Sequence, residues 1–158
     1  MNKRLIFTGI AFFIIMFAAA ASETLAQTVS GSISNGTLAK GGRGRGTIVL
    51  SIPGNLHVNS SKPNSEYLIA TSIRLSGGNG ARVSGVKYPR GVNRKFQFSE
   101  KALNVYEGTV RFPFTVTVPA NFKGNTVSVR AVVRYQACTD EVCYPPKTRE
   151  ITMTARVR

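Results

Sequence analysis

Histidine, cysteine and tryptophan are scarce in this sequence of 158 residues, which has one histidine, two cysteines and no tryptophan. A single histidine without a nucleophile motif around it gives no support for a hydrolase. Two cysteines and one histidine also fall short of the four ligands of a structural zinc site, so carboxylates would have to complete it. The chain lacks the tryptophan and the inter-sheet cysteine pair of antibody domains.

Long hydrophobic runs are limited to the first part of the chain. Two basic residues precede an apolar run at residues 5–21, and small residues follow at a spacing suited to cleavage after Ala26. This pattern is typical of a secretory signal peptide over residues 1–26, so we expect an exported, periplasmic or extracytoplasmic protein. If residues 5–21 stayed uncleaved, they would anchor the protein in a membrane. Export places the cysteines where a disulfide persists.

Acidic residues are few, since seven Asp and Glu oppose 21 Lys and Arg and the formal net charge is +14. Such a charge favours anionic partners. Only the tract KGGRGRG at residues 40–46 resembles an arginine–glycine nucleic-acid segment, and export argues against a nucleic-acid ligand. The other basic residues are spread singly along expected strands, as on the solvated face of a sheet. Examples are Arg74, Arg82, Arg111, Arg130, Arg134 and Arg156.

No long stretch has helical periodicity, whereas alternation of apolar and polar residues recurs between turn signals. We therefore predict an all-β fold, an immunoglobulin-like antiparallel β-sandwich at residues 47–158. A flexible or loosely strand-forming lead-in, rich in Gly and Ser, is expected at residues 27–46. The expected strands cover residues 48–52, 67–75, 110–118, 127–135 and 151–157, with shorter candidates at 81–87 and 96–98.

Both cysteines lie in one short segment, YQACTDEVCYPP at residues 135–146. A disulfide across so short a loop removes little unfolded-state entropy, about 2 kcal/mol in the chain-entropy model, roughly half of what a bond spanning ~100 residues would give. This favours a pair that opens and closes over a staple for the fold. A bond that only stiffens its own hairpin is the structural alternative. Thr139–Val142 suits a hairpin connection, whose facing residues are close enough for a disulfide.

Strand alternation predicts which way the first sulfur points. If Val133 and Tyr135 face the core, Cys138 lies in the outward register, so we expect its sulfur to be accessible. The two prolines after Cys143 break the register, and the pattern leaves its direction open. Asp140 and Glu141 disfavour a thiolate while flanking basic residues favour it, which leaves the direction of the thiol pKa shift open.

The segment YQACTDEVCYPPKTREI resembles the N-terminal periplasmic domain of the thiol:disulfide interchange protein DsbD. In that family Tyr-Gln-x-Cys and a short acidic loop precede Cys-Tyr-Pro-Pro. The resemblance covers about residues 50–158 and implies an immunoglobulin-like sandwich. It also implies that electrons pass by disulfide exchange to thioredoxin-like envelope oxidoreductases, such as disulfide isomerases and cytochrome c maturation factors, without a metal or organic cofactor.

Carried over to this sequence, the resemblance makes Cys138 and Cys143 the redox pair, with Cys143 forming the mixed disulfide with a partner. Residues 95–100 correspond to the family's cap loop, although its acidic-aromatic motif is absent, and core positions in a short strand are the alternative for the aromatics there. His57 lies near a position where the family often has an aromatic or a histidine, but a lone histidine is more often structural. Candidates for the cap or environment of the pair are Phe96, Phe98, Tyr135, Asp140, Glu141 and Tyr144.

Two departures from the family shape the functional expectation. The cysteines are closer together than in its best-known members, and no membrane or thioredoxin-like domain follows in this sequence. We therefore expect a stand-alone exported protein with protein-disulfide reductase or interchange activity, reduced by a separate membrane or thioredoxin-like electron donor. The alternative is a secreted immunoglobulin-like binding module in which the same disulfide is inert.

Overall fold

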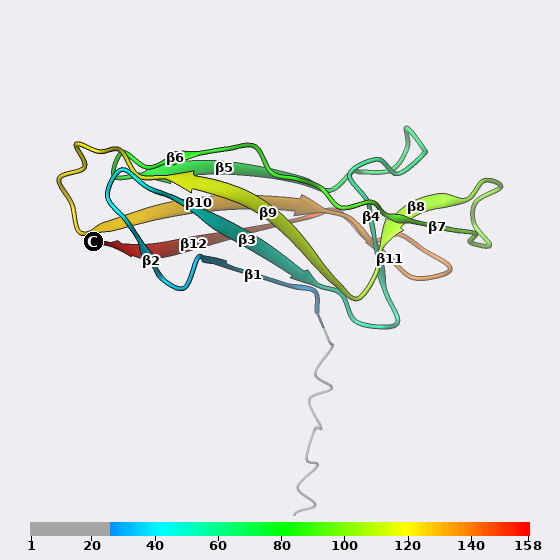
Figure 1. Cartoon of the computed structure of the whole chain (residues 1–158). Coiled ribbons are helices and arrows are strands. Elements are labelled where there is room, and N and C mark those ends of the chain that lie inside the picture. Colours follow the sequence, from blue (N-terminus) through cyan, green and yellow to red (C-terminus); the bar gives the residue numbers. More distant parts are fainter. Residues whose placement is uncertain (1–25) are drawn as a thin grey trace, which may run out of the picture.

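The computed structural model describes residues 26–158, and these residues form twelve β-strands and no α-helix (Figure 1). In this part of the chain, no helix is long and apolar enough to cross a membrane. The signal peptide expected at residues 1–26 and the anchor considered at residues 5–21 lie outside the described residues, apart from Ala26.

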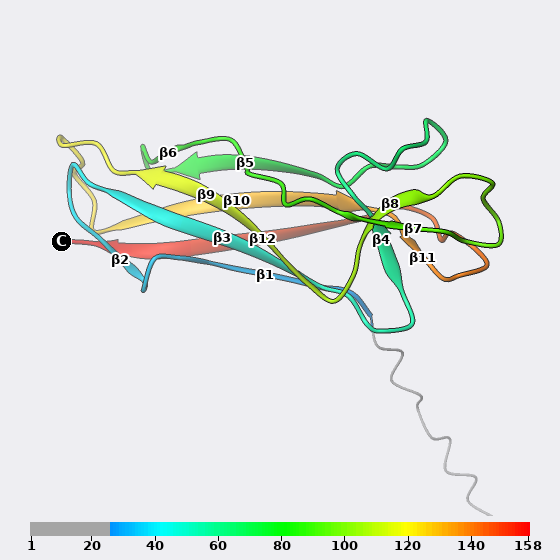
Figure 2. The same ribbon diagram turned by 45° about the vertical axis from the view of Figure 1, so that its right-hand side comes forward.

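Two four-stranded sheets face each other along the length of the domain (Figures 1 and 2). The first contains, in spatial order, β1 (Thr28–Ile33), β3 (Arg43–Ser51), β9 (Thr109–Thr117) and β6 (Arg82–Val83). The second contains β2 (Thr37–Leu38), β12 (Lys147–Val157), β10 (Thr126–Tyr135) and β5 (Ser72–Gly78). All pairs in both sheets are antiparallel except β2 with β12. The predicted immunoglobulin-like β-sandwich is confirmed.

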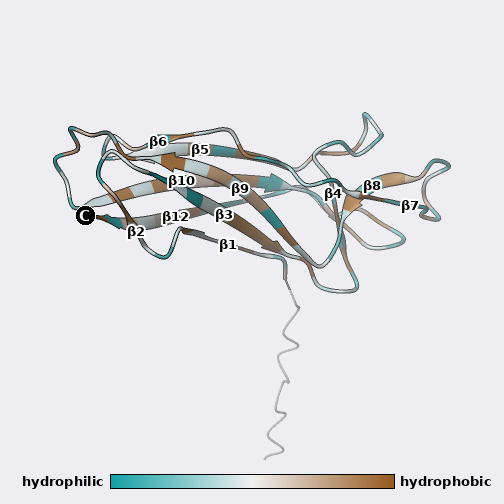
Figure 3. Ribbon diagram, in the orientation of Figure 1, coloured by the Kyte–Doolittle hydropathy of each residue, from teal (hydrophilic) through white to brown (hydrophobic). Residues whose placement is uncertain are grey.

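The core lies between these sheets because the long strands bury every second residue. In β9 and β10 the inward residues are almost entirely apolar, and most have no exposed surface. Figure 3 shows apolar residues along β3 and β9 alternating with more polar ones. Each fully buried valine or phenylalanine side chain contributes roughly 1.5–3 kcal/mol relative to an exposed one. The inward residues of β9 and β10 are Val110, Phe112, Phe114, Val116, Val127, Val129, Ala131, Val133 and Tyr135.

The arginines expected on solvated faces are exposed on their strands or strand ends. Arg130 of β10 forms a two-pronged ion pair with Glu150 of the neighbouring β12. The tract at residues 40–46 leads into β3, where Arg43 and Arg45 are exposed while Gly46 is buried opposite Phe114. A Cβ on Gly46 would overlap the Phe114 ring. Glycine at this position therefore serves a close ring-to-backbone approach within the sandwich.

Of the two alternatives for the lead-in at residues 27–46, flexible or strand-forming, the structure has the strand-forming one. β1 pairs with β3 along its full length, and β2 pairs with the end of β12. Ile33 and Leu38 from this segment are buried in the main core. Its small residues permit close packing, since a Cβ on Gly31 would overlap the Met153 side chain of β12. A Ser- and Gly-rich composition thus produces an edge strand whose neighbours supply most of the apolar surface.

The strand expected at residues 67–75 begins later, at Ser72. Tyr67 is 86% exposed, and the peptide groups of Ile69 are bonded by side chains rather than by a neighbouring strand. The expected strand at residues 81–87 is reduced to β6. That at residues 96–98 is absent, since these residues belong to the loop between β7 (Val92–Arg94) and β8 (Leu103–Tyr106).

A third, smaller sheet lies at one end of the sandwich, and the C-terminus lies at the other (Figures 1 and 2). Its spatial order is β11 (Ala137–Cys138), β4 (His57–Asn59), β8 and β7. One face joins the main core through Val58, Tyr106 and Ala137. The other face carries the first cysteine.

Candidate active site

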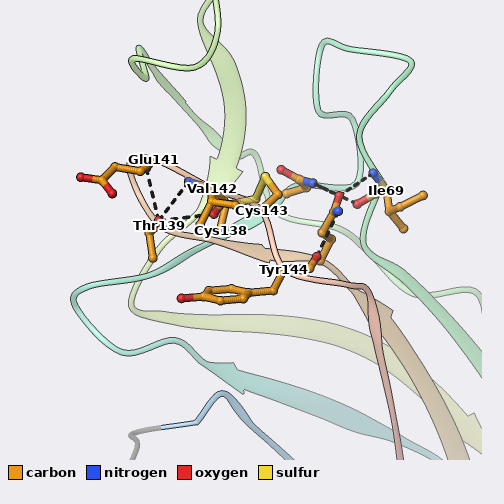
Figure 4. Close-up of a disulfide and its surroundings, with 9 residues drawn as sticks. Ile69, Cys138, Thr139, Glu141, Val142, Cys143 and Tyr144 are labelled. Carbon is orange, nitrogen blue, oxygen red and sulfur yellow. Dashed lines mark hydrogen bonds between the residues drawn. A yellow bond between two sulfur atoms is a disulfide. The ribbon is translucent and has the colours of Figure 1, made fainter.

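Cys138 and Cys143 form a disulfide that closes a tight hairpin at the end of the third sheet (Figure 4). Their Cα atoms are 3.9 Å apart, and the two residues form an isolated antiparallel bridge. Within the turn the Thr139 amide donates to the Val142 carbonyl at 2.8 Å. The Thr139 hydroxyl oxygen accepts bonds from the amides of Glu141 and Val142 at 3.2 and 3.1 Å. The hairpin connection expected at residues 139–142 is therefore present.

The two sulfur-bearing residues differ in exposure. Cys138 is 0% exposed, whereas Cys143 is half-buried. The predicted direction of Cys138, away from the main core, is correct, because Cys138 is not part of that core cluster while the preceding Ala137 is. The predicted accessibility is wrong, because a second layer covers this face of the third sheet. Of the two residues, only Cys143 offers exposed surface to an approaching thiol.

His57 lies directly opposite Cys138 in the β4–β11 ladder. The next pair on the same face is Asn59 and Gln136, whose side chains are joined by a 2.9 Å hydrogen bond. Residues directly opposite each other in an antiparallel ladder point to the same face of the sheet. The imidazole of His57 therefore stands beside the Cys138 side chain, on the face that points away from the main core.

Aromatic rings from the β7–β8 loop form part of the cover. The Phe96 ring stacks on His57 with centroids 4.0 Å apart and planes at 16°. Phe98 in turn stacks on Phe96 at 5.4 Å but is itself 40% exposed. Phe96 also packs with Leu103 and Val105 in a small apolar cluster separate from the main core. Of the two cap candidates, Phe96 thus lies in the inner layer and Phe98 in the outer one.

The Gln136 side chain connects three segments around the disulfide. Its Oε1 accepts hydrogen bonds from Asn59 Nδ2 at 2.9 Å and from the Ile69 amide at 3.0 Å. Its Nε2 donates to the carbonyl of Tyr144 at 3.2 Å. One amide therefore ties β4, the segment before β5 and the residue after Cys143 together.

Replacing Gln136 with alanine is expected to destabilise the domain by about 1–3 kcal/mol, because the Ile69 amide and the Tyr144 carbonyl lose their hydrogen bonds to the Gln136 side chain. Urea unfolding of the oxidised protein measures the change. Gln97→Ala, in the exposed β7–β8 loop, is the matched control and should change stability by less than about 0.5 kcal/mol. Equal effects of the two substitutions would contradict a connecting role for Gln136.

The remaining candidates are divided between the disulfide and the main core. Asp140 and Glu141 are exposed in the turn between the cysteines. Tyr144 follows Cys143, is 44% exposed, and its amide donates to the Ala137 carbonyl at 2.9 Å. Tyr135 is fully buried in the main core, so the structure does not place it with the disulfide.

His57 is 3% exposed and its Nε2 atom has no hydrogen-bond partner. Burial lowers the pKa of His57 from its ordinary value of 6.5, and the carboxylates of Asp140 and Glu107 act in the opposite direction. The imidazole is therefore mostly uncharged at pH 7. Sequence reasoning gave His57 little weight and missed Asn59 and Gln136, although Gln136 stands inside the Tyr-Gln-x-Cys motif. In residues 26–158, no three His, Cys, Asp or Glu side chains are grouped to hold a metal.

Comparison with known families gives a match over most of the domain. The family described as "Thiol:disulfide interchange protein DsbD, N-terminal" matches residues 37–155. This range contains β2 to β11, both cysteines and nearly all of β12. None of the curated proteins searched matches the chain.

Similar folds occur among solved structures. The N-terminal periplasmic domain of ScsB from Proteus mirabilis is 13% identical and has a TM-score of 0.52, with 78% of this chain and 43% of that chain covered. This chain thus spans less than half of that structure. The N-terminal domain of DsbD from Neisseria meningitidis, solved in the reduced form, is 17% identical with a TM-score of 0.41, covering 70% of this chain and 80% of that one. At this level of identity, the likeness to the ScsB domain shows a shared fold.

Proposed function

Because the chain belongs to the family of N-terminal domains of the thiol:disulfide interchange protein DsbD, we propose that its Cys138–Cys143 disulfide exchanges with the thiols of thioredoxin-like proteins. The observation that carries the proposal is the pairing of these cysteines at the end of a family domain, with one residue half-buried and the other fully covered. Such asymmetry suits stepwise exchange, since it directs an incoming thiol to one sulfur.

The exchange begins at Cys143. A thiolate of the partner attacks the Cys143 sulfur, the Cys138–Cys143 bond breaks, and Cys138 takes the electron pair and then a proton. The second thiol of the same partner then attacks that partner's own sulfur in the mixed disulfide. This step releases Cys143 as a thiolate, oxidises the partner to a disulfide and leaves this protein as a dithiol. The same steps in reverse pass two electrons to the disulfide of another partner.

The proposed setting is the cell envelope. The N-terminal sequence supports export, and the family supports thioredoxin-like oxidoreductases as partners. A separate membrane or thioredoxin-like protein would supply the electrons, and envelope thioredoxin-like proteins, including those of cytochrome c maturation, would receive them. Phe96 and His57 would shield Cys138 between encounters, since Phe96 stacks on the residue that faces Cys138.

The equilibrium reduction potential of the Cys138–Cys143 couple tests this function. The purified protein is equilibrated in glutathione or dithiothreitol buffers, and its thiols are alkylated and counted by mass. We expect a potential above about −300 mV, because structural disulfides of secreted proteins lie below that value and working ones above it. A bond that resists reduction well below −300 mV would favour the inert hairpin clip of a secreted binding module.

A further inference from the structure

The reduced form of the site poses a problem of proton transfer at Cys138. When the protein passes electrons to a partner, Cys138 must attack the Cys143 sulfur of the mixed disulfide to form the Cys138–Cys143 bond again. A thiol attacks only after losing its proton. Cys138 has no exposed surface, so bulk water does not reach it directly. A buried thiolate without a compensating charge is also costly. A proton acceptor beside this sulfur would remove both obstacles.

His57 is the titratable side chain that faces Cys138 across the ladder. It is directly opposite Cys138 in the ladder, while the neighbouring pair, Val58 and Ala137, points into the main core. His57 and Cys138 therefore share the opposite face, where the Cβ atoms of facing residues are about 4.5–5.5 Å apart. Its Nε2 atom is buried and has no hydrogen-bond partner. This is the condition of an imidazole nitrogen that is free to accept a proton.

The charges around His57 support a transient imidazolium. Burial keeps the ring neutral and able to accept a proton, while Asp140 in the turn and Glu107 after β8 favour the protonated form. Glu107 is itself paired with Arg94 of β7 at 2.9 Å. Phe96 stacked on the ring fixes the plane of the imidazole. An imidazolium formed by proton transfer from Cys138 would thus be favoured by the carboxylates of Asp140 and Glu107.

We propose that His57 accepts the proton of the Cys138 thiol as Cys138 attacks the mixed disulfide between Cys143 and a partner. The inference rests on the proposed function of the same site. The Cys138 sulfur bonds to the Cys143 sulfur, the bond from Cys143 to the partner breaks, and its electron pair leaves on the partner sulfur. The proton passes from Cys138 to His57 Nε2 and then to the departing thiolate or to water. In the opposite direction, His57 Nε2 first takes a proton from the partner thiol or from water and passes it to the Cys138 sulfur as the Cys138–Cys143 bond breaks.

Closure of a glutathione mixed disulfide tests this step. The reduced protein is mixed with oxidised glutathione and quenched in acid at intervals, and the Cys143–glutathione adduct and the closed disulfide are counted by mass from pH 6 to 9. In the wild type we expect closure to be independent of pH between about pH 7 and 8. His57→Phe and His57→Asn should slow closure at pH 7 about 100-fold, as expected for loss of a positioned proton acceptor. Their rates should rise with pH to at least about 8.5, the ordinary pKa of a thiol, because burial disfavours the Cys138 thiolate.

A matched variant separates proton transfer from packing. Phe96→Leu removes the stacked ring but keeps the imidazole, so it should retain the flat profile even if its rate changes. His57 variants that close with the wild-type rate and pH profile would overturn the proposal. If both His57 variants unfold, the pH profile of the wild type is the test. A wild-type closure rate that rises tenfold per pH unit up to about pH 8.5 would also overturn the proposal. A wild type that never exchanges with glutathione would overturn the proposed function itself, and with it this inference.

Discussion

Cys138→Ala is expected to hold a partner in a stable mixed disulfide, whereas Cys143→Ala is expected to form almost none. Cys143 keeps partly exposed surface, so it reacts with an incoming disulfide, and without Cys138 no neighbouring thiol resolves the product. Cys138 alone is fully buried beside His57 and beneath the aromatic cover. The yield of adduct should differ by at least about tenfold between the two variants, since reactivity requires access as well as a thiolate.

The two variants are controls for each other. Both lose the same short-loop disulfide, so both should lose about 2 kcal/mol of stability in the chain-entropy model. Each is incubated with oxidised glutathione or with a thioredoxin-fold protein in its disulfide form, and the adduct is counted by mass. Adduct formation by Cys143→Ala but not by Cys138→Ala would assign the roles of the two sulfurs the other way round.

Phe112→Ala is expected to destabilise the domain by about 3–5 kcal/mol, a large part of the 5–15 kcal/mol typical of a folded domain. The ring is fully buried in β9 and contacts the rings of Tyr88 and Tyr106 edge-on, at 5.8 and 5.6 Å between centroids. The Tyr106 hydroxyl donates to the carbonyl of Pro89 at 3.1 Å. The cavity would thus weaken the junction between the sandwich and the third sheet.

Urea unfolding monitored by tyrosine fluorescence measures this loss. Phe98→Ala removes the same side chain from the partly exposed outer layer and should cost well under half as much. A loss below about 1 kcal/mol for Phe112→Ala would mean that the neighbouring rings collapse into the space, and that Phe112 does not support the junction.

The sandwich could be predicted from sequence because its central strands bury alternate residues on one face only. Val127 to Tyr135 show this pattern without interruption, and the structure follows it residue by residue. The edge strand β1 could not be predicted in this way, since few of its own residues are large and apolar. Its position depends on backbone bonds to β3 and on small residues that fit against β12.

The candidate site shows the same division. Alternation predicted the outward direction of Cys138, because direction is a local property of the strand. Its burial depends on long-range packing: Phe96, which stacks on the facing His57, lies in a loop about 40 residues away in the sequence, and Leu103 and Val105 of β8 pack with it. His57 and Cys138, which pair in the ladder, are still farther apart in the sequence. No local pattern carries such information, and the single histidine therefore looked like a structural residue.

The disulfide hairpin and the C-terminus occupy opposite ends of an elongated domain (Figure 1). A fluorophore, a surface linker or a fused module joined after Arg158 would therefore be separated from Cys143 by the length of the sandwich. Protein immobilised through that end would present its reactive end to the solution with the same orientation in every molecule. A tethered redox module, in contrast, would need a linker at least as long as the domain to reach the hairpin of its own molecule.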